Sequence, residues 1–96
     1  MFQDIVNVIV YDSKEEFNTI NNTVRGSAFV ECIYNSITLH IINNESYGII
    51  AHEAYHIALR MLELNGIYNS ENINDNEECI AKLVEFIVEE LIKLIK

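Results

Sequence analysis

Two of the three histidines in this chain stand four residues apart, and a glutamate directly follows the first of them: His52, Glu53 and His56. On an α-helix, residues four apart lie one turn above each other on the same face. Two imidazoles placed in this way can occupy two corners of one tetrahedral Zn²⁺, at about 2.0–2.1 Å each. The HExxH pattern therefore predicts a helix that carries a zinc site. The alternative interpretation is a pair of surface histidines on an amphipathic helix.

The glutamate of the motif has a predicted chemical role. Glu53 is placed next to the open position of such a metal site, where it can take a proton from a water molecule and pass it to a leaving amine. We therefore expect Glu53 to be the catalytic residue. The alternative is a solvated glutamate on the helix surface.

Composition limits the class of protein. With 96 residues, of which 50% are hydrophobic, the chain is expected to form one domain over residues 1–96. Its formal net charge of -9 argues against nucleic acid as a partner, because no basic stripe is present to neutralise phosphates. The same charge disfavours binding to an anionic membrane surface.

The sequence also carries signals about the compartment. It has no run of 18 apolar residues, and the segment Met1–Val10 has no basic region of the kind that opens a signal peptide. Cys32 and Cys79 are far apart and lack CxxC spacing, so we expect a buried, reduced pair. These features predict a cytoplasmic protein.

Hydrophobic periodicity and turn residues divide the chain into six elements. Strands are expected over Ile5–Tyr11, Ala28–Tyr34 and Ser36–Ile42, with a tight hairpin at Asn35. Helices are expected over Lys14–Asn21 after a cap at Asp12 or Ser13, over Ser46–Leu64 before the stop signal Asn65-Gly66, and over Asn76–Ile95 after a cap at Asn74 or Asp75. The order β-α-β-β-α-α predicts an α+β fold, with a short sheet packed on two helices.

Helical projection separates two faces of the expected helix that carries the motif. Its apolar stripe consists of Ile50, Ala54, Ile57, Ala58 and Met61, and the two histidines lie roughly opposite this stripe. We therefore expect the helix to pack on the sheet and to present His52 and His56 to a cleft.

A catalytic zinc site has three protein ligands and one open position. The candidates for the third ligand are His40, at the end of the third strand, and Glu77 and Glu78, at the start of the last helix. By helical projection Glu77 falls inside the apolar arc of that helix and Glu78 at its edge, so periodicity favours Glu77. The alternative is that both glutamates only stabilise the helix N-terminus.

Two stretches resemble a known family. The stretch from Ile49 to His56 resembles the IxHExxH helix of small, often phage-encoded gluzincin-type metallopeptidases, and the stretch from Asn76 to Ile87 resembles their downstream E-x-x-A helix. In this register Glu78 is the implied third ligand and Ala81 the small residue that lets the two helices approach. The resemblance implies a minimal zincin-like fold. It further implies that Ser36–Ile42 is the edge strand along which an extended substrate binds.

Together, the motif and the resemblance predict a zinc metallopeptidase that hydrolyses a peptide or protein substrate. Its metal ligands are His52, His56 and Glu78, its cofactor is Zn²⁺, and Glu53 is the general base. Two alternatives belong to other classes: a non-catalytic, zinc-bearing binding module, and an interaction protein of a mobile element that has lost the metal. The sequence leaves the oligomeric state open.

Overall fold

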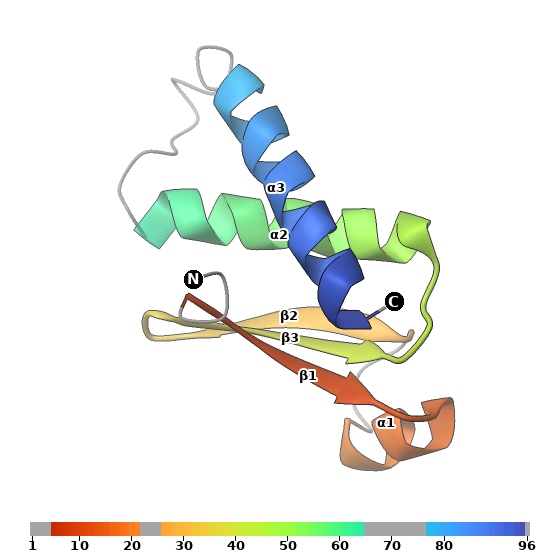
Figure 1. The fold of residues 1–96 in the computed structure, drawn as a ribbon. Coiled ribbons are helices and arrows are strands. Elements are labelled where there is room, and N and C mark those ends of the chain that lie inside the picture. The colour runs from red at the N-terminus through yellow and green to blue at the C-terminus, as the bar shows by residue number, and fades with distance from the viewer. Residues whose placement is uncertain (1–4, 22–25, 65–76, 96) are drawn as a thin grey trace.

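A computed structural model of the chain describes residues 5–21, 26–64 and 77–95. The elements follow in the predicted order β-α-β-β-α-α (Figure 1). Their bounds are β1 (Val6–Tyr11), α1 (Lys14–Ile20), β2 (Ala28–Ile33), β3 (Ser36–Ile42), α2 (Tyr47–Leu64) and α3 (Glu77–Ile95). They agree with the expected bounds to within one residue at each end. The predicted signals at Asn65-Gly66 and at Asn74 or Asp75 lie outside the described residues.

The three strands form a mixed sheet in the order β1-β3-β2. β1 runs parallel to β3, with Val6 opposite Ile37, and β2 pairs with β3 in the antiparallel direction, with Ile33 opposite Ser36. The predicted hairpin is confirmed. Its turn places Tyr34 at φ 55°, in the left-handed region that non-glycine residues seldom adopt.

The strand order corrects one expectation. Ser36–Ile42 was expected to be an edge strand, but β3 is the central strand, and its backbone pairs with β1 on one side and β2 on the other. The connection through α1 places β1 on the far side of β3, and so takes away the edge that the hairpin alone would have left free. The edges of the described sheet are β1 and β2.

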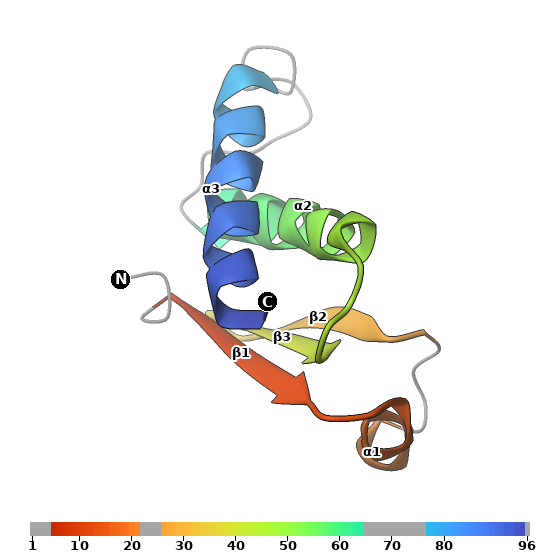
Figure 2. The same ribbon diagram turned by 45° about the vertical axis from the view of Figure 1, so that its right-hand side comes forward.

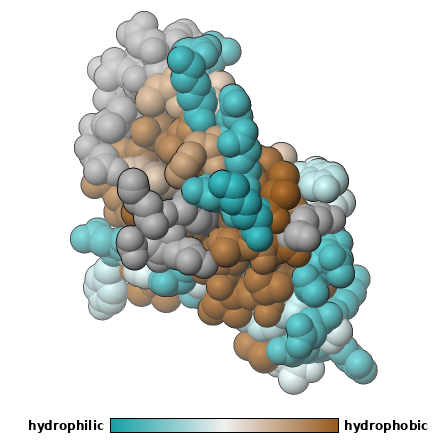
Figure 3. Space-filling model, viewed as in Figure 1, coloured by the Kyte–Doolittle hydropathy of each residue, from teal (hydrophilic) through white to brown (hydrophobic). Residues whose placement is uncertain are grey.

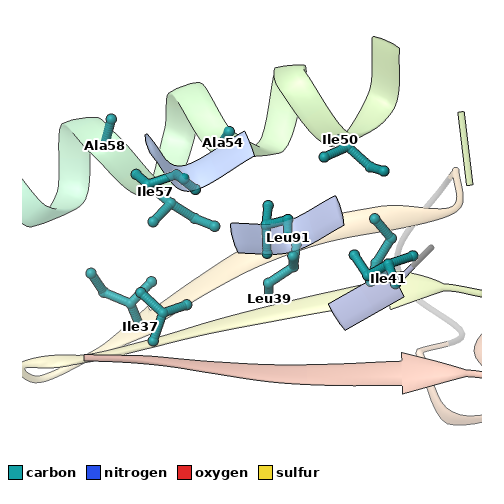
Figure 4. Close-up of a cluster of buried hydrophobic side chains, with 11 residues drawn as sticks. Ile37, Leu39, Ile41, Ile50, Ala54, Ile57, Ala58 and Leu91 are labelled. Carbon is teal, nitrogen blue, oxygen red and sulfur yellow. The ribbon is translucent and has the colours of Figure 1, made fainter. Parts of the chain in front are cut away.

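The main core lies between the sheet and the two long helices. Ile37, Leu39 and Ile41 point from β3 towards α2, where Ile57 is fully buried (Figure 4). α3 crosses α2, and its carboxyl end approaches the sheet (Figures 1 and 2). Buried residues at this end of α3 join the same cluster, so the core ties α3 to both α2 and the sheet. In Figure 3 a hydrophilic stripe runs along the outer side of α3, with hydrophobic side chains beside it.

A smaller cluster lies on the other side of the sheet, where α1 is found (Figure 1). Ser13 caps α1 by accepting a hydrogen bond from the backbone N–H of Glu16 at 3.1 Å. Phe17 of α1 is fully buried and makes edge-to-face contacts with Tyr11 and Phe29. α1 therefore closes the end of the second sheet face.

The cysteines differ from expectation. Cys32 and Cys79 are free thiols, but both are exposed and do not form a buried pair. Cys32 lies near the end of the edge strand β2, and Cys79 lies in the first turn of α3, where neither thiol is covered.

Candidate metal centre

The HExxH motif lies on α2, as predicted, two turns from a well-formed helix start. Ser46 caps this helix: its hydroxyl accepts a hydrogen bond from the Ile49 N–H at 3.3 Å, and its carbonyl accepts one from the Ile50 N–H at 3.0 Å. Burial of Ile50 and Ile57 against the sheet fixes the rotation of α2 about its axis. The motif side chains are thereby directed to the side of α2 that lies next to β2.

The two motif histidines point towards each other. The Nε2 atoms of His52 and His56 are 3.2 Å apart, and the ring centroids are 4.8 Å apart. Two nitrogens at zinc-ligand distance from one tetrahedral ion are separated by about 3.3–3.4 Å. The pair of nitrogens therefore has the spacing of two corners of such a site, and the arrangement fits a bound divalent cation.

Glu53 is buried beneath this pair. Its exposed fraction is 5%, and its Oε1 atom lies 3.9 Å from Nε2 of His52. Its Oε2 atom is buried and has no hydrogen-bond partner among the described residues. Burial raises the pKa of the Glu53 carboxyl above the usual 4.5, while His52 and His56 oppose the shift. A buried carboxylate oxygen without a partner is costly, and a ligand, a water molecule or a proton on the carboxyl would each relieve that cost.

The Glu53 carboxyl lines a groove between α2 and β2. One cavity, of about 270 Å³, extends from Glu53 past His56, and a second, of about 410 Å³, extends from Glu53 past His52. β2 forms the wall opposite α2 in both, with Ala28 shared between them. Both histidines are exposed, with 68% of the His52 side chain accessible, so the expected cleft is an open groove.

The described residues do not bring a third metal ligand to the histidine pair. Within residues 5–21, 26–64 and 77–95, no group of three His, Cys, Asp or Glu side chains is placed to hold a metal ion. Glu77 and Glu78 are both exposed in the first turn of α3. Ala81 is exposed as well, so this small residue does not lie at the contact between α2 and α3.

His40 lies on the opposite face of the sheet from the motif. Along β3 the side chains alternate, and Leu39 and Ile41 face the core under α2. His40 instead stacks on Phe29 at a centroid distance of 4.4 Å, and its Nδ1 atom lies 2.9 Å from the Tyr11 hydroxyl. The sheet separates His40 from the motif histidines, which excludes it as a ligand to the same ion.

Two features of the site were missed from the sequence. β2, not β3, borders the motif, and Arg60 lines the cavity next to His56. Helix spacing gives a signal for Arg60, because it stands four residues after His56, one further turn along the same face.

Comparisons with protein-family models, with curated proteins and with solved structures give no match to this chain. Within the described residues, no helix is long and apolar enough to cross a membrane. The assignment of function therefore rests on the motif and on the geometry around it.

Proposed function

We propose that this chain is a zinc-dependent metallopeptidase with a minimal zincin-like, gluzincin-type site. The main support for this proposal is the arrangement of three side chains on α2, those of His52, Glu53 and His56. Two imidazole nitrogens converge at 3.2 Å beside a buried carboxylate whose second oxygen has no partner among the described residues. A hydrogen bond between two surface histidines would explain the convergence, but it would leave the buried Oε2 atom of Glu53 without a partner among the described residues.

The proposed ligands are His52, His56 and Glu78. The first two are supported by their convergence, and Glu78 by its register with Ala81 in the sequence. A zinc ion held there supplies Lewis acidity, which polarises a carbonyl group and lowers the pKa of water towards about 7. Glu77 is the alternative third ligand, because helical projection directs it more towards the apolar side of α3.

Glu53 moves the proton in the proposed reaction. A water oxygen attacks the scissile carbonyl carbon, and Glu53 accepts the proton that this water loses. When the carbon–nitrogen bond breaks, Glu53 delivers that proton to the departing nitrogen. Its raised pKa suits this double role, because a group with a pKa nearer the working pH both accepts and returns a proton efficiently.

The edge strand β2 is the proposed substrate-binding strand, in place of β3. Its residues Ala28–Val30 line the cavity that contains Glu53 and His56, and its outer edge is unpaired in the described sheet. An extended peptide added to this edge takes main-chain hydrogen bonds from β2, which holds its carbonyl groups in a row beside α2.

Replacing Glu53 by Gln tests the proposal. The variant Glu53→Gln keeps the size of the side chain but cannot accept a proton, so it should bind zinc like the unmutated protein and lose peptide hydrolysis. Glu85→Gln, at an exposed position on α3, makes the same chemical change away from the site and should keep full activity. Hydrolysis that persists in Glu53→Gln would overturn the assigned role of the glutamate.

A second function is favoured by the openness of the site. With 68% of the His52 side chain accessible, the surrounding residues enclose the histidine pair only in part. This suits a zinc-bearing module that binds another protein without cleaving it. In that case the unmutated protein and Glu53→Gln both bind zinc and neither hydrolyses any peptide.

A further inference from the structure

The groove is chemically asymmetric about Glu53. On the side of His52 its described lining consists of small and apolar residues together with the motif: Gly26, Ser27, Ala28, Gly48, Ile49, His52 and Glu53. On the side of His56 the lining includes Arg60, the one Arg or Lys among the described residues that line either cavity. A fixed positive charge at one end gives the groove a means of selecting a substrate.

Arg60 is held in place while keeping donors free for a ligand. Its terminal nitrogen Nη1 donates to Glu63 at 2.7 Å, one turn further along α2. A guanidinium carries five N–H donors, so this bond engages one of them, and the described residues leave the others to a ligand. The hydrogen bond to Glu63 also raises the pKa of Arg60, which keeps the side chain charged.

The direction of the groove follows from its lining. Going from one cavity to the other, α2 advances from Gly48 to Arg60 while β2 advances from Ser27 to Val30, so helix and strand run the same way. Antiparallel pairing is the more stable mode of strand addition. A peptide that adds to β2 in this mode has its amino-terminal part at Arg60.

The distance of Arg60 from the proposed metal centre determines which residue of a bound peptide it can contact. Arg60 stands four residues after His56, a rise of about 6 Å along the helix. An extended peptide advances by about 3.3 Å per residue, so this rise corresponds to about two residues. We propose that Arg60 selects substrates with an acidic side chain within two residues on the amino-terminal side of the cleaved bond, an inference that rests on the proposed peptidase function.

The test measures which peptides the protein cleaves and, separately, which peptides it binds. The zinc-loaded protein is incubated with a proteome-derived peptide library, and mass spectrometry identifies each cleaved bond. For matched synthetic peptides that carry Glu or Gln at the selected position, we expect hydrolysis to be about tenfold faster with Glu. That factor corresponds to about 1.4 kcal/mol for one exposed, charge-assisted contact. The preference should shrink in Arg60→Gln and reverse in Arg60→Glu.

The control is Lys14→Glu, which makes the same change of charge on α1, on the other side of the sheet, and should leave the preference unchanged. If hydrolysis depends on Glu53 but the ratio between Glu and Gln peptides is the same in Arg60→Gln, the inference is wrong and the peptidase stands. If no peptide is cleaved, anisotropy with Glu53→Gln decides, using labelled pools of extended peptides that differ only in carrying Glu or Gln at one position. Tighter binding of the Glu pool that Arg60→Gln abolishes supports the role of Arg60, and equal binding of both pools overturns it.

Discussion

The Nε2 atoms of His52 and His56 lie 3.2 Å apart on consecutive turns of α2. Their spacing of one helical turn brings the two imidazoles together on one side of α2, and buried Glu53 lies next to them. One nitrogen donates and the other accepts when the two rings hydrogen-bond, whereas both lone pairs must be available to a cation. Replacing the shared proton by a metal ion would therefore need no rearrangement of the α2 backbone.

Replacing Glu53 by Gln should change how the metal-free protein responds to pH. Burial raises the pKa of Glu53, so its ionised form destabilises the folded state. This penalty is absent below the usual pKa of 4.5 and grows as the pH rises towards the raised pKa. The stability advantage of Glu53→Gln should therefore increase with pH, by at most about 1.4 kcal/mol per unit.

Urea unfolding with chelator at pH 4.5 and pH 8 measures this change. Glu85→Gln serves as the control, because its exposed carboxylate has no burial penalty to lose. A stability difference between Glu53→Gln and the unmutated protein that is the same at both pH values would show that Glu53 is not desolvated as described.

Removing the Tyr11 hydroxyl should lower the free energy of unfolding and leave the zinc content unchanged. Tyr11→Phe leaves Nδ1 of buried His40 without its partner, and a lost buried hydrogen bond of this kind costs about 1–3 kcal/mol. Zinc content should not change, because the pair lies across the sheet from α2. Tyr34→Phe is the control, since Tyr34 is 95% exposed. Loss of zinc in Tyr11→Phe would place His40 in the metal site after all.

The two glutamates at the start of α3 should differ in their effect on zinc. Glu78→Ala is expected to weaken zinc binding much more than Glu77→Ala, because the register with Ala81 selects Glu78. Competition with a coloured zinc chelator measures both affinities. A larger effect at Glu77 would show that helical projection was the better guide, in agreement with the exposure of Ala81.

Zinc should also stabilise the fold. The proposed ligands from α2 and α3 would hold the two helices together, and an ion at a thousandfold excess over its dissociation constant contributes about 4 kcal/mol. Each kcal/mol moves the melting midpoint of a domain of this size by about 4–8 °C. Calorimetry with and without chelator should therefore show a loss of more than about 10 °C. An unchanged midpoint after proven removal of bound zinc would exclude Glu77 and Glu78 as bridging ligands.

The sequence predicted the elements well because their signals are local. Asn35 marks the hairpin turn, and Ser13, one of the two predicted caps of α1, caps it through side-chain chemistry within one helical turn. α2 begins after Ser46, one residue later than predicted. Strand order is not local. Nothing in Ser36–Ile42 itself reveals that the connection through α1 places β1 on its outer side.

The same distinction between local and tertiary features explains which parts of the site were predicted from the sequence. Helix spacing alone gave the convergence of His52 and His56, since both lie on one element. The burial of Glu53 and the groove depend on β2, whose position comes from the tertiary fold. The third ligand depends on how two helices pack, whereas a helical projection gives only a direction about one axis.

The zinc content of purified protein tests the central claim most directly. After reconstitution with Zn²⁺ and removal of excess metal, the unmutated chain should contain about one zinc per chain by elemental analysis. His52→Ala and His56→Ala should each lose most of it, while Lys14→Glu should retain it. Zinc near zero in the unmutated protein would contradict the account, because the converging histidines would then be only a surface pair.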